Sequence, residues 1–138
     1  MDQYMNTNFF RVTDEQAYAE LISHLYGVEA CDPCRYEKPG ANGETLHTFT
    51  SCCGLEYYPT VDDADKLDEA HPADWDAFTT ELGKLLPEGE AAIIITTAGP
   101  SAHAEIITRT GKRYIDLDLI ATDAASQMLG DPNWKTDF

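Results

Sequence analysis

The fold is decided by residues 91–117, AAIIITTAGPSAHAEIITRTGKRYIDL, in which three apolar runs are separated by two turns. Ala91 to Thr97 is β-branched and almost continuously hydrophobic, which is typical of a central strand. Gly99-Pro100 turns the chain, and Ala104 to Thr110 returns it. A second glycine turn leads into the third run, Arg113 to Leu117. The pattern therefore predicts an antiparallel meander of three strands.

A strand and a helix are expected before this meander. Asn8 to Val12 has the composition of a short strand. Thr13 with Gln16 is a capping-box pattern, and the apolar residues that follow recur with helical spacing until Tyr26, just before Gly27. This segment predicts a strand followed by an amphipathic helix that ends at the glycine.

Two further helices are expected, one before and one after the meander in the sequence. Pro72 suits the first turn of a helix whose apolar positions, from Trp75 to Leu86, recur at spacings of three and four residues. A last helix from about Leu119 to Leu129, closed by Gly130, is expected to cover the sheet.

The middle of the chain supplies the remaining strands. Leu46 to Thr50 and Leu55 to Tyr58 carry aromatic and β-branched residues, and Arg35 to Glu37 is able to pair with Leu46 to Phe49 across a Pro-Gly turn. The order β-α-β-β-α-β-β-β-α predicts an α+β domain spanning residues 1–138, with an antiparallel sheet of five to six strands and two or three helices on one face.

Charge is the other dominant feature of the sequence. Nine lysines and arginines stand against 25 acidic residues, which gives a formal net charge of -16. A potential of this sign repels nucleic acid and anionic lipid and favours encounter with basic surfaces. Residues 56–90 alone hold eleven acids against two lysines, and 60–71 is expected to be a mobile acidic loop. The expected partner is therefore a basic protein surface, with no nucleic acid and no membrane.

The acidic segment is the first candidate binding site. Its carboxylates could occupy a basic groove that normally takes nucleic acid, or they could simply be the hydrated side of a helix and loop. Tyr57 and Tyr58 at its edge, and Trp134, are candidate anchors. The candidate acidic residues are Asp62, Asp63, Asp65, Asp68, Glu69, Asp74, Asp76 and Glu81.

Four cysteines form the second candidate site. Cys31 and Cys34 make a Cys-x-x-Cys pair that is followed by Cys52 and Cys53, and four thiolates with His47 in reserve could hold zinc. Adjacent cysteines point in different directions along a strand, so free thiols or a disulfide stay open as alternatives.

Asp116 and Asp118 form a third, catalytic candidate. Alternate residues on a strand share a face, as two carboxylates do in some metal and acid–base sites. The alternative is that they form the polar side of the strand and that Asp118 caps the next helix. No nucleophile motif accompanies the four histidines.

Several short stretches resemble small acidic proteins carried on mobile elements of gut Firmicutes, a group without an assigned activity. The stretches are Phe10 to Glu15, Leu86 to Ala91, Tyr114 to Leu117 and Met128 to Trp134. The resemblance implies mobile-element cargo and transfers no functional residue.

The expected function is that of a non-enzymatic acidic binding or inhibitor protein, which mimics nucleic acid in the basic groove of a defence or nucleic-acid-processing protein. An immunity protein for a basic toxin, a small zinc-binding module and a carboxylate-dependent enzyme are the alternatives. The longest apolar run, Ala91 to Ile95, is far shorter than the roughly 20 residues that span a bilayer, and a cytoplasmic location is expected.

Overall fold

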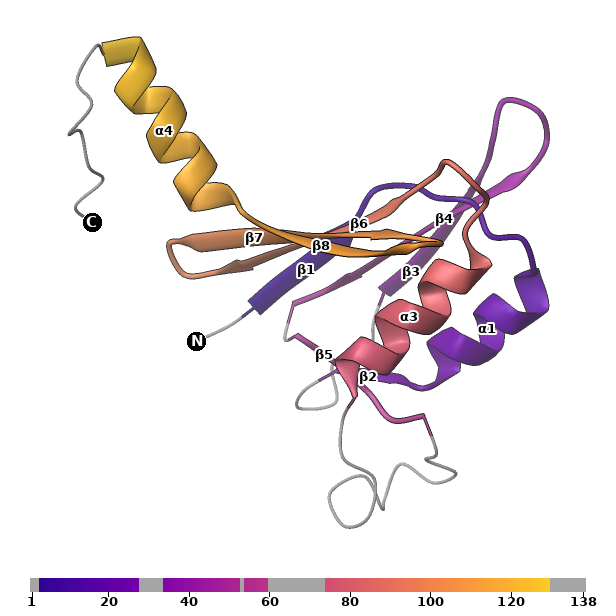
Figure 1. Ribbon diagram of the computed structural model, residues 1–138. Helices are drawn as coiled ribbons and strands as arrows, with labels where there is room; N and C mark the ends of the chain where they lie inside the picture. Colours follow the sequence, from indigo (N-terminus) through magenta and orange to yellow (C-terminus); the bar gives the residue numbers. More distant parts are fainter. Residues whose placement is uncertain (1–2, 28–33, 53, 60–73, 130–138) are drawn as a thin grey trace.

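The computed structural model describes residues 3–27, 34–52, 54–59 and 74–129, which form an α+β fold (Figure 1). Six antiparallel strands make one sheet, in the order β3-β4-β1-β6-β7-β8. Their bounds are Gln3–Thr7 (β1), Cys34–Pro39 (β3), Thr45–Ser51 (β4), Ala92–Ala98 (β6), Ser101–Thr108 (β7) and Gly111–Asp116 (β8). A smaller sheet pairs β2 (Leu25–Gly27) with β5 (Leu55–Tyr57), and the helices are α1 (Glu15–Ser23), α3 (Trp75–Leu85) and α4 (Leu117–Leu129).

The expected meander is confirmed as β6, β7 and β8. Ala98 pairs with Ser101 across the turn at Gly99-Pro100, and Thr108 pairs with Gly111 across the next turn. Gly99 has a φ of 59°, which a residue with a side chain rarely adopts. Each turn therefore leaves only two residues between paired strands, which fixes the register of the meander.

The first strand lies earlier in the chain than the sequence indicates. β1 pairs with both β4 and β6, whereas the stretch expected to be a strand, Asn8 to Val12, contributes only an isolated bridge between Phe10 and His47. The Asn8 side chain accepts a hydrogen bond from Ile93 N and donates one to the Ala91 carbonyl. Because this amide replaces the backbone beyond Thr7, the ladder between β1 and β6 ends there.

Helix α1 begins and ends differently from its expected bounds. Asp14 rather than Thr13 is the N-cap, since its Oδ1 accepts a hydrogen bond from Ala17 N at 3.0 Å. The helix ends at Ser23, and Leu25 and Tyr26 form β2 instead of a last helical turn.

Helix α3 agrees with the expected spacing of apolar residues. Asp74 is its N-cap, and its Phe78 and Leu82 are fully buried against the sheet. Gly83 lets the helix approach β7 closely, because a Cβ atom at this position would lie 2.6 Å from the Thr108 carbonyl oxygen. Pro72, expected in the first turn, lies outside the described residues.

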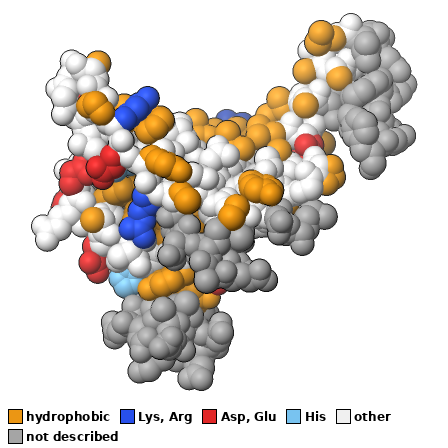
Figure 2. Space-filling model, turned by 180° about the vertical axis from the view of Figure 1, so that it is seen from behind, with side chains coloured by type: hydrophobic (Ala, Val, Ile, Leu, Met, Phe, Trp, Pro, Cys, Tyr) orange, Lys and Arg blue, Asp and Glu red, His pale blue; other side chains and the backbone are white. Residues whose placement is uncertain are grey.

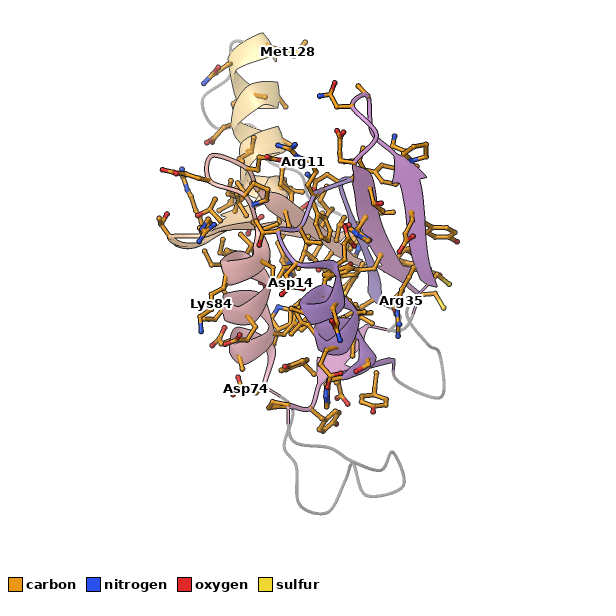
Figure 3. The ribbon with its side chains drawn as sticks, turned by 90° about the vertical axis from the view of Figure 1, so that its right-hand side faces the viewer. Arg11, Asp14, Arg35, Asp74, Lys84 and Met128 are labelled. Carbon is orange, nitrogen blue, oxygen red and sulfur yellow. The ribbon has the colours of Figure 1, made fainter. Side chains whose placement is uncertain are left out.

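The two faces of the sheet differ. Helices α1 and α3 cover one face, and the core between them and the sheet contains the side chains of Ile22, Phe49, Phe78, Leu82, Leu86, Ile94 and Ile107. The expectation that the last helix also covers the sheet is wrong. Helix α4 extends away from the end of β8, with the Met128 side chain 87% exposed (Figures 1 and 3).

Candidate functional site

The predicted acidic residues fall into two groups. Asp62, Asp63, Asp65, Asp68 and Glu69, with the rest of residues 60–71, lie outside the described residues, as does Trp134. The other three are on or at the start of α3, and each has a partner. Asp74 caps the helix by accepting from Ala77 N at 3.0 Å, Asp76 accepts from Lys112 Nζ at 2.7 Å, and Glu81 accepts from Lys84 Nζ at 2.9 Å.

The two candidate anchors are mostly buried. Tyr57 and Tyr58 are each only 6% exposed. The Tyr58 hydroxyl donates to Glu56 Oε2 at 2.6 Å. The Tyr57 ring packs against Phe78, with centroids 5.4 Å apart, and one part of it faces a groove.

This groove lies between α1 and α3, which run side by side under the sheet (Figures 1 and 3). It has a volume of about 440 Å³, and its inner surface is apolar, with Leu21, Tyr57 and Leu85 among the lining side chains. Glu20 on α1 and Glu81 on α3 are both exposed and line it from opposite helices. We call this feature the acidic groove.

The carboxylates around the acidic groove act on Tyr57, one of the residues that line it. Burial raises the pKa of the Tyr57 hydroxyl, and the charges of Glu81, Asp74 and Glu20 raise it further because they disfavour the phenolate. Three carboxylates from α1, from α3 and from the cap of α3 therefore act on this one hydroxyl. The position of Asp74 is fixed by its cap and by the hydrogen bond from its backbone N to the Tyr57 carbonyl, 2.8 Å long.

An apolar groove with carboxylates at its edge suits a lysine or arginine side chain. The aliphatic stem of such a residue covers apolar surface while its cationic head stays near solvent and acids. Leu21 and Leu85 offer the apolar surface, and Glu20 and Glu81 offer acceptors for the head. The groove can therefore take a basic side chain from a partner.

Comparison with protein-family models, with curated proteins and with solved structures finds no match for this chain.

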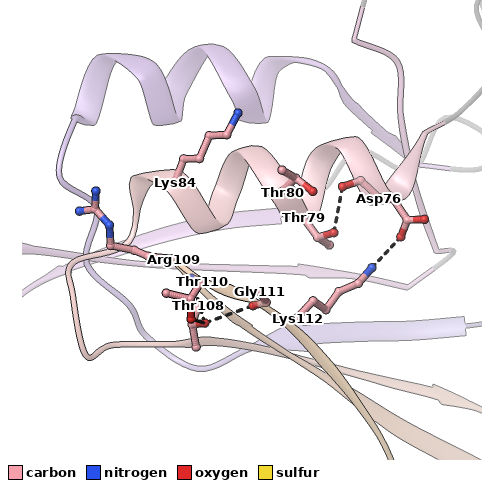
Figure 4. Close-up of a pocket in the computed structure, with 9 residues that line it drawn as sticks. All are labelled: Asp76, Thr79, Thr80, Lys84, Thr108, Arg109, Thr110, Gly111 and Lys112. Carbon is pink, nitrogen blue, oxygen red and sulfur yellow. Dashed lines mark hydrogen bonds and ion pairs between the residues drawn. The ribbon is translucent and has the colours of Figure 1, made fainter.

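A second pocket contains cations but does not favour an anion. It lies between α3 and the β7–β8 turn, has a volume of about 310 Å³, and is lined by Lys84, Arg109 and Lys112. Figure 4 shows these three side chains pointing in different directions. The Lys112 ammonium lies 2.7 Å from Asp76 and 3.6 Å from Glu105. Its hydrogen bond and charge lower the pKa of Asp76. The positive charges are thus dispersed and partly neutralised.

A buried histidine between carboxylates was not foreseen from the sequence. His47 on β4 is 3% exposed, with Nε2 2.6 Å from Glu15 Oε2 and Nδ1 3.7 Å from Glu37 Oε1. These contacts join α1, β3 and β4, so His47 has a structural partner on each ring nitrogen. Its neighbour Tyr18 has the one buried side-chain polar atom, within the part of the chain that the structure describes, without a hydrogen-bond partner.

The zinc prediction falls largely outside the described residues. Cys31 and Cys53 are not among them, and Cys34 and Cys52 are both exposed. Across 3–27, 34–52, 54–59 and 74–129, no three histidine, cysteine or acidic side chains are grouped as metal ligands would be. The strand pairing beside the cysteines is confirmed, since Arg35 is opposite Phe49 and Glu37 is opposite His47.

The two carboxylates proposed for catalysis do not share a strand face. Asp116 ends β8, and its Oδ1 accepts from Asp118 N at 3.0 Å and from Leu119 N at 3.2 Å. Asp118 lies in the first turn of α4 and accepts from Ala102 N at 3.1 Å. Asp116 rather than Asp118 therefore caps the helix, and both carboxylates bind backbone groups.

No helix in the described ranges is both long enough and apolar enough to cross a bilayer.

Proposed function

We propose that this protein is a non-enzymatic binding protein that takes basic side chains of a protein partner into the acidic groove between α1 and α3. The observation that carries the proposal is the groove itself, whose apolar interior has Glu20 and Glu81 at its edge, one from each of the two helices. The acidic segment expected from the sequence supplies only part of this site. Helix α1 supplies the rest.

The net charge supports the same function over a longer range. A molecule with 25 acids and nine bases attracts a basic partner before contact, so the gain is expected mainly in the association rate. Contact then depends on the groove, where a cation leaves bulk water only partly and keeps carboxylate acceptors. We therefore expect binding that weakens steeply as salt is added.

Titration with a fluorescent deca-arginine peptide tests the groove. Glu20→Gln and Glu81→Gln each remove one acid from its edge, and each is expected to weaken binding about two- to fivefold, as for partly exposed ion pairs. Glu88→Gln is the matched control, because Glu88 is an exposed glutamate outside the groove lining. Equal losses for all three variants would reduce the effect to net charge and would contradict a role for the groove.

Competition with nucleic acid tests the finer proposal that the partner is a nucleic-acid-binding protein. The chain is immobilised, partners are captured from a host lysate at about 50 mM salt, and duplex DNA or RNA is then added in excess. Release of the captured protein by nucleic acid would support mimicry of nucleic acid. Retention in excess nucleic acid would favour the alternative of an immunity-type inhibitor that binds elsewhere on a basic partner.

A further inference from the structure

The face of the sheet opposite α1 and α3 is apolar and has no described helix lying over it. The strand registers place on this open face the side chains that alternate with the buried ones of the core. They include Ile93, Ile95, Ile106 and Ile115, all half-buried, and Tyr4 and Tyr36, both 54% exposed. Hydrophobic side chains gather along the hollow between α4 and the β3–β4 hairpin (Figure 2).

The charge of the open face is opposite to that of the protein. Among the described strand residues that the registers assign to it, the charged ones are Lys38 and Arg113, and both are basic. Lys38 Nζ lies 4.0 Å from the centroid of the Phe9 ring, which adds another exposed apolar group beside the face. In a chain of net charge -16, this face is a basic and apolar exception.

Helix α4 has the complementary properties. Leu119, Ile120 and Met128 are 64%, 54% and 87% exposed, and the helix carries Asp118 and Asp123 but no lysine or arginine. Its first turn is fixed to β7 by the hydrogen bond from Ala102 N to Asp118. From there the helix points away from the sheet, on the side opposite α1 and α3 (Figure 1). Its exposed residues therefore do not pack on the sheet of their own chain.

We propose that the open face binds α4 of a second copy of this chain, in a symmetric dimer in which each copy contributes one helix and one face. An apolar acidic helix and an apolar basic face in the same chain satisfy the requirement of a two-fold interface, where the same pair of surfaces meets twice. Of the seven large hydrophobic side chains that are exposed in the described residues, six belong to α4, to the open face or to Phe9 beside it. A patch of this kind on one side marks an interaction site.

Sedimentation velocity over a range of protein concentration tests the dimer. Tyr36→Asp on the open face and Ile120→Asp on α4 are each expected to raise the dimer dissociation constant at least tenfold, because each puts a carboxylate into an apolar contact. Tyr114→Asp is the matched control, since Tyr114 is also exposed but stacks on His103 on the other face of the sheet. It is expected to leave the dissociation constant unchanged.

Mixing the two damaged variants distinguishes exchange of α4 from any other mode of association. A chain with Tyr36→Asp retains an intact helix, and a chain with Ile120→Asp retains an intact face, so a mixed dimer contains one undamaged contact. The mixture is expected to associate more tightly than either variant alone. No gain on mixing would overturn the reciprocal arrangement.

Salt separates this proposal from the proposed function. Two copies of net charge -16 repel each other, and salt screens that repulsion, so dimerisation is expected to tighten between about 0.05 and 0.5 M salt while peptide binding weakens. A protein that stays monomeric up to about 1 mM at the higher salt would overturn the dimer. That result would not affect the proposal that the acidic groove binds basic side chains.

Discussion

Among the described residues, Tyr18 has a buried hydroxyl without a hydrogen-bond partner. Its ring is buried against Phe10 and His47, and burial raises the pKa of its hydroxyl strongly. A buried hydroxyl without a partner costs about 1–3 kcal/mol of stability. We therefore expect Tyr18→Phe to raise the free energy of unfolding by about 1 kcal/mol in urea titrations.

Tyr58→Phe is the control for that prediction, because the Tyr58 hydroxyl donates to Glu56. It is expected to lower the free energy of unfolding by about 0.5–1.5 kcal/mol. A loss of stability in Tyr18→Phe as well would contradict a hydroxyl without a hydrogen-bond partner.

The pKa of the Tyr57 hydroxyl is a measure of how strongly the carboxylates of the acidic groove act on it. Because the folded-state pKa lies above the ordinary value of 10.0, the neutral phenol contributes stability at pH below 10.0, and this contribution is lost as the pH rises through the folded-state pKa. Glu81→Gln removes the largest of the charges acting on it and is expected to lower the pKa of Tyr57. Carbon-13 NMR of the tyrosine rings resolves this titration, with Glu88→Gln as the control. An unchanged pKa in Glu81→Gln would show that Glu81 does not act on the groove.

At the scale of elements, Gly83 sets how closely α3 approaches the sheet. Replacing an interior helix glycine by alanine ordinarily stabilises a helix by up to about 1 kcal/mol. Here the added Cβ would lie 2.6 Å from the Thr108 carbonyl oxygen and 3.4 Å from Ile107 Cγ2. We expect Gly83→Ala to lower the free energy of unfolding by about 1–3 kcal/mol, because the backbone of β7 must move. Thr80→Ala, at an exposed position of α3, is expected to be nearly neutral, and a stabilising Gly83→Ala would contradict the close packing.

The elements that sequence analysis predicted well are those whose pattern is local. The meander has short turns and continuous β-branched runs, and the spacing from Trp75 to Leu86 follows the period of a helix, so the fold class and these elements are confirmed. The errors occur where a residue distant in the sequence determines where an element ends. Asn8 ends β1 through contacts with β6, and Leu25 leaves α1 to pair with Tyr57, more than thirty residues away.

The last helix is another case in which the local sequence pattern does not determine the contacts that the element makes. The apolar residues of α4 predict burial, and the sequence alone cannot distinguish burial in its own chain from burial in another. The structure leaves them exposed, which is the basis for proposing a second copy.

The candidate site was only half visible in the sequence for a similar reason. Asp74 and Glu81 were found because acids are dense along that segment, but Glu20 is an isolated acid on α1 that gains its significance from the neighbouring helix. Its position three residues after Ala17 and one before Leu21, at the edge of the apolar stripe, was the available signal. Placing it opposite Glu81 required knowing that α1 and α3 pack together.

At the scale of the whole molecule, two surfaces of opposite character lie on opposite sides of the sheet. The acidic groove lies on the side of α1 and α3, and the apolar, basic face lies on the other. A basic partner and a second copy would therefore not compete for the same surface. We expect Tyr36→Asp and Ile120→Asp to leave binding of the deca-arginine peptide within about twofold of the unaltered protein when the added charge is allowed for.

The most direct test of the account is to map where a basic peptide binds. In a nitrogen-15 and carbon-13 NMR titration with deca-arginine at about 50 mM salt, the account predicts the largest shifts at the acidic groove, including the Glu20 and Ala77 amides and the Tyr57 ring. Ile95 and Ile106, on the open face, are expected to be almost unaffected. Shifts that are small in the groove, or no larger there than over the rest of the acidic surface, would contradict the central claim that the groove between α1 and α3 is the binding site.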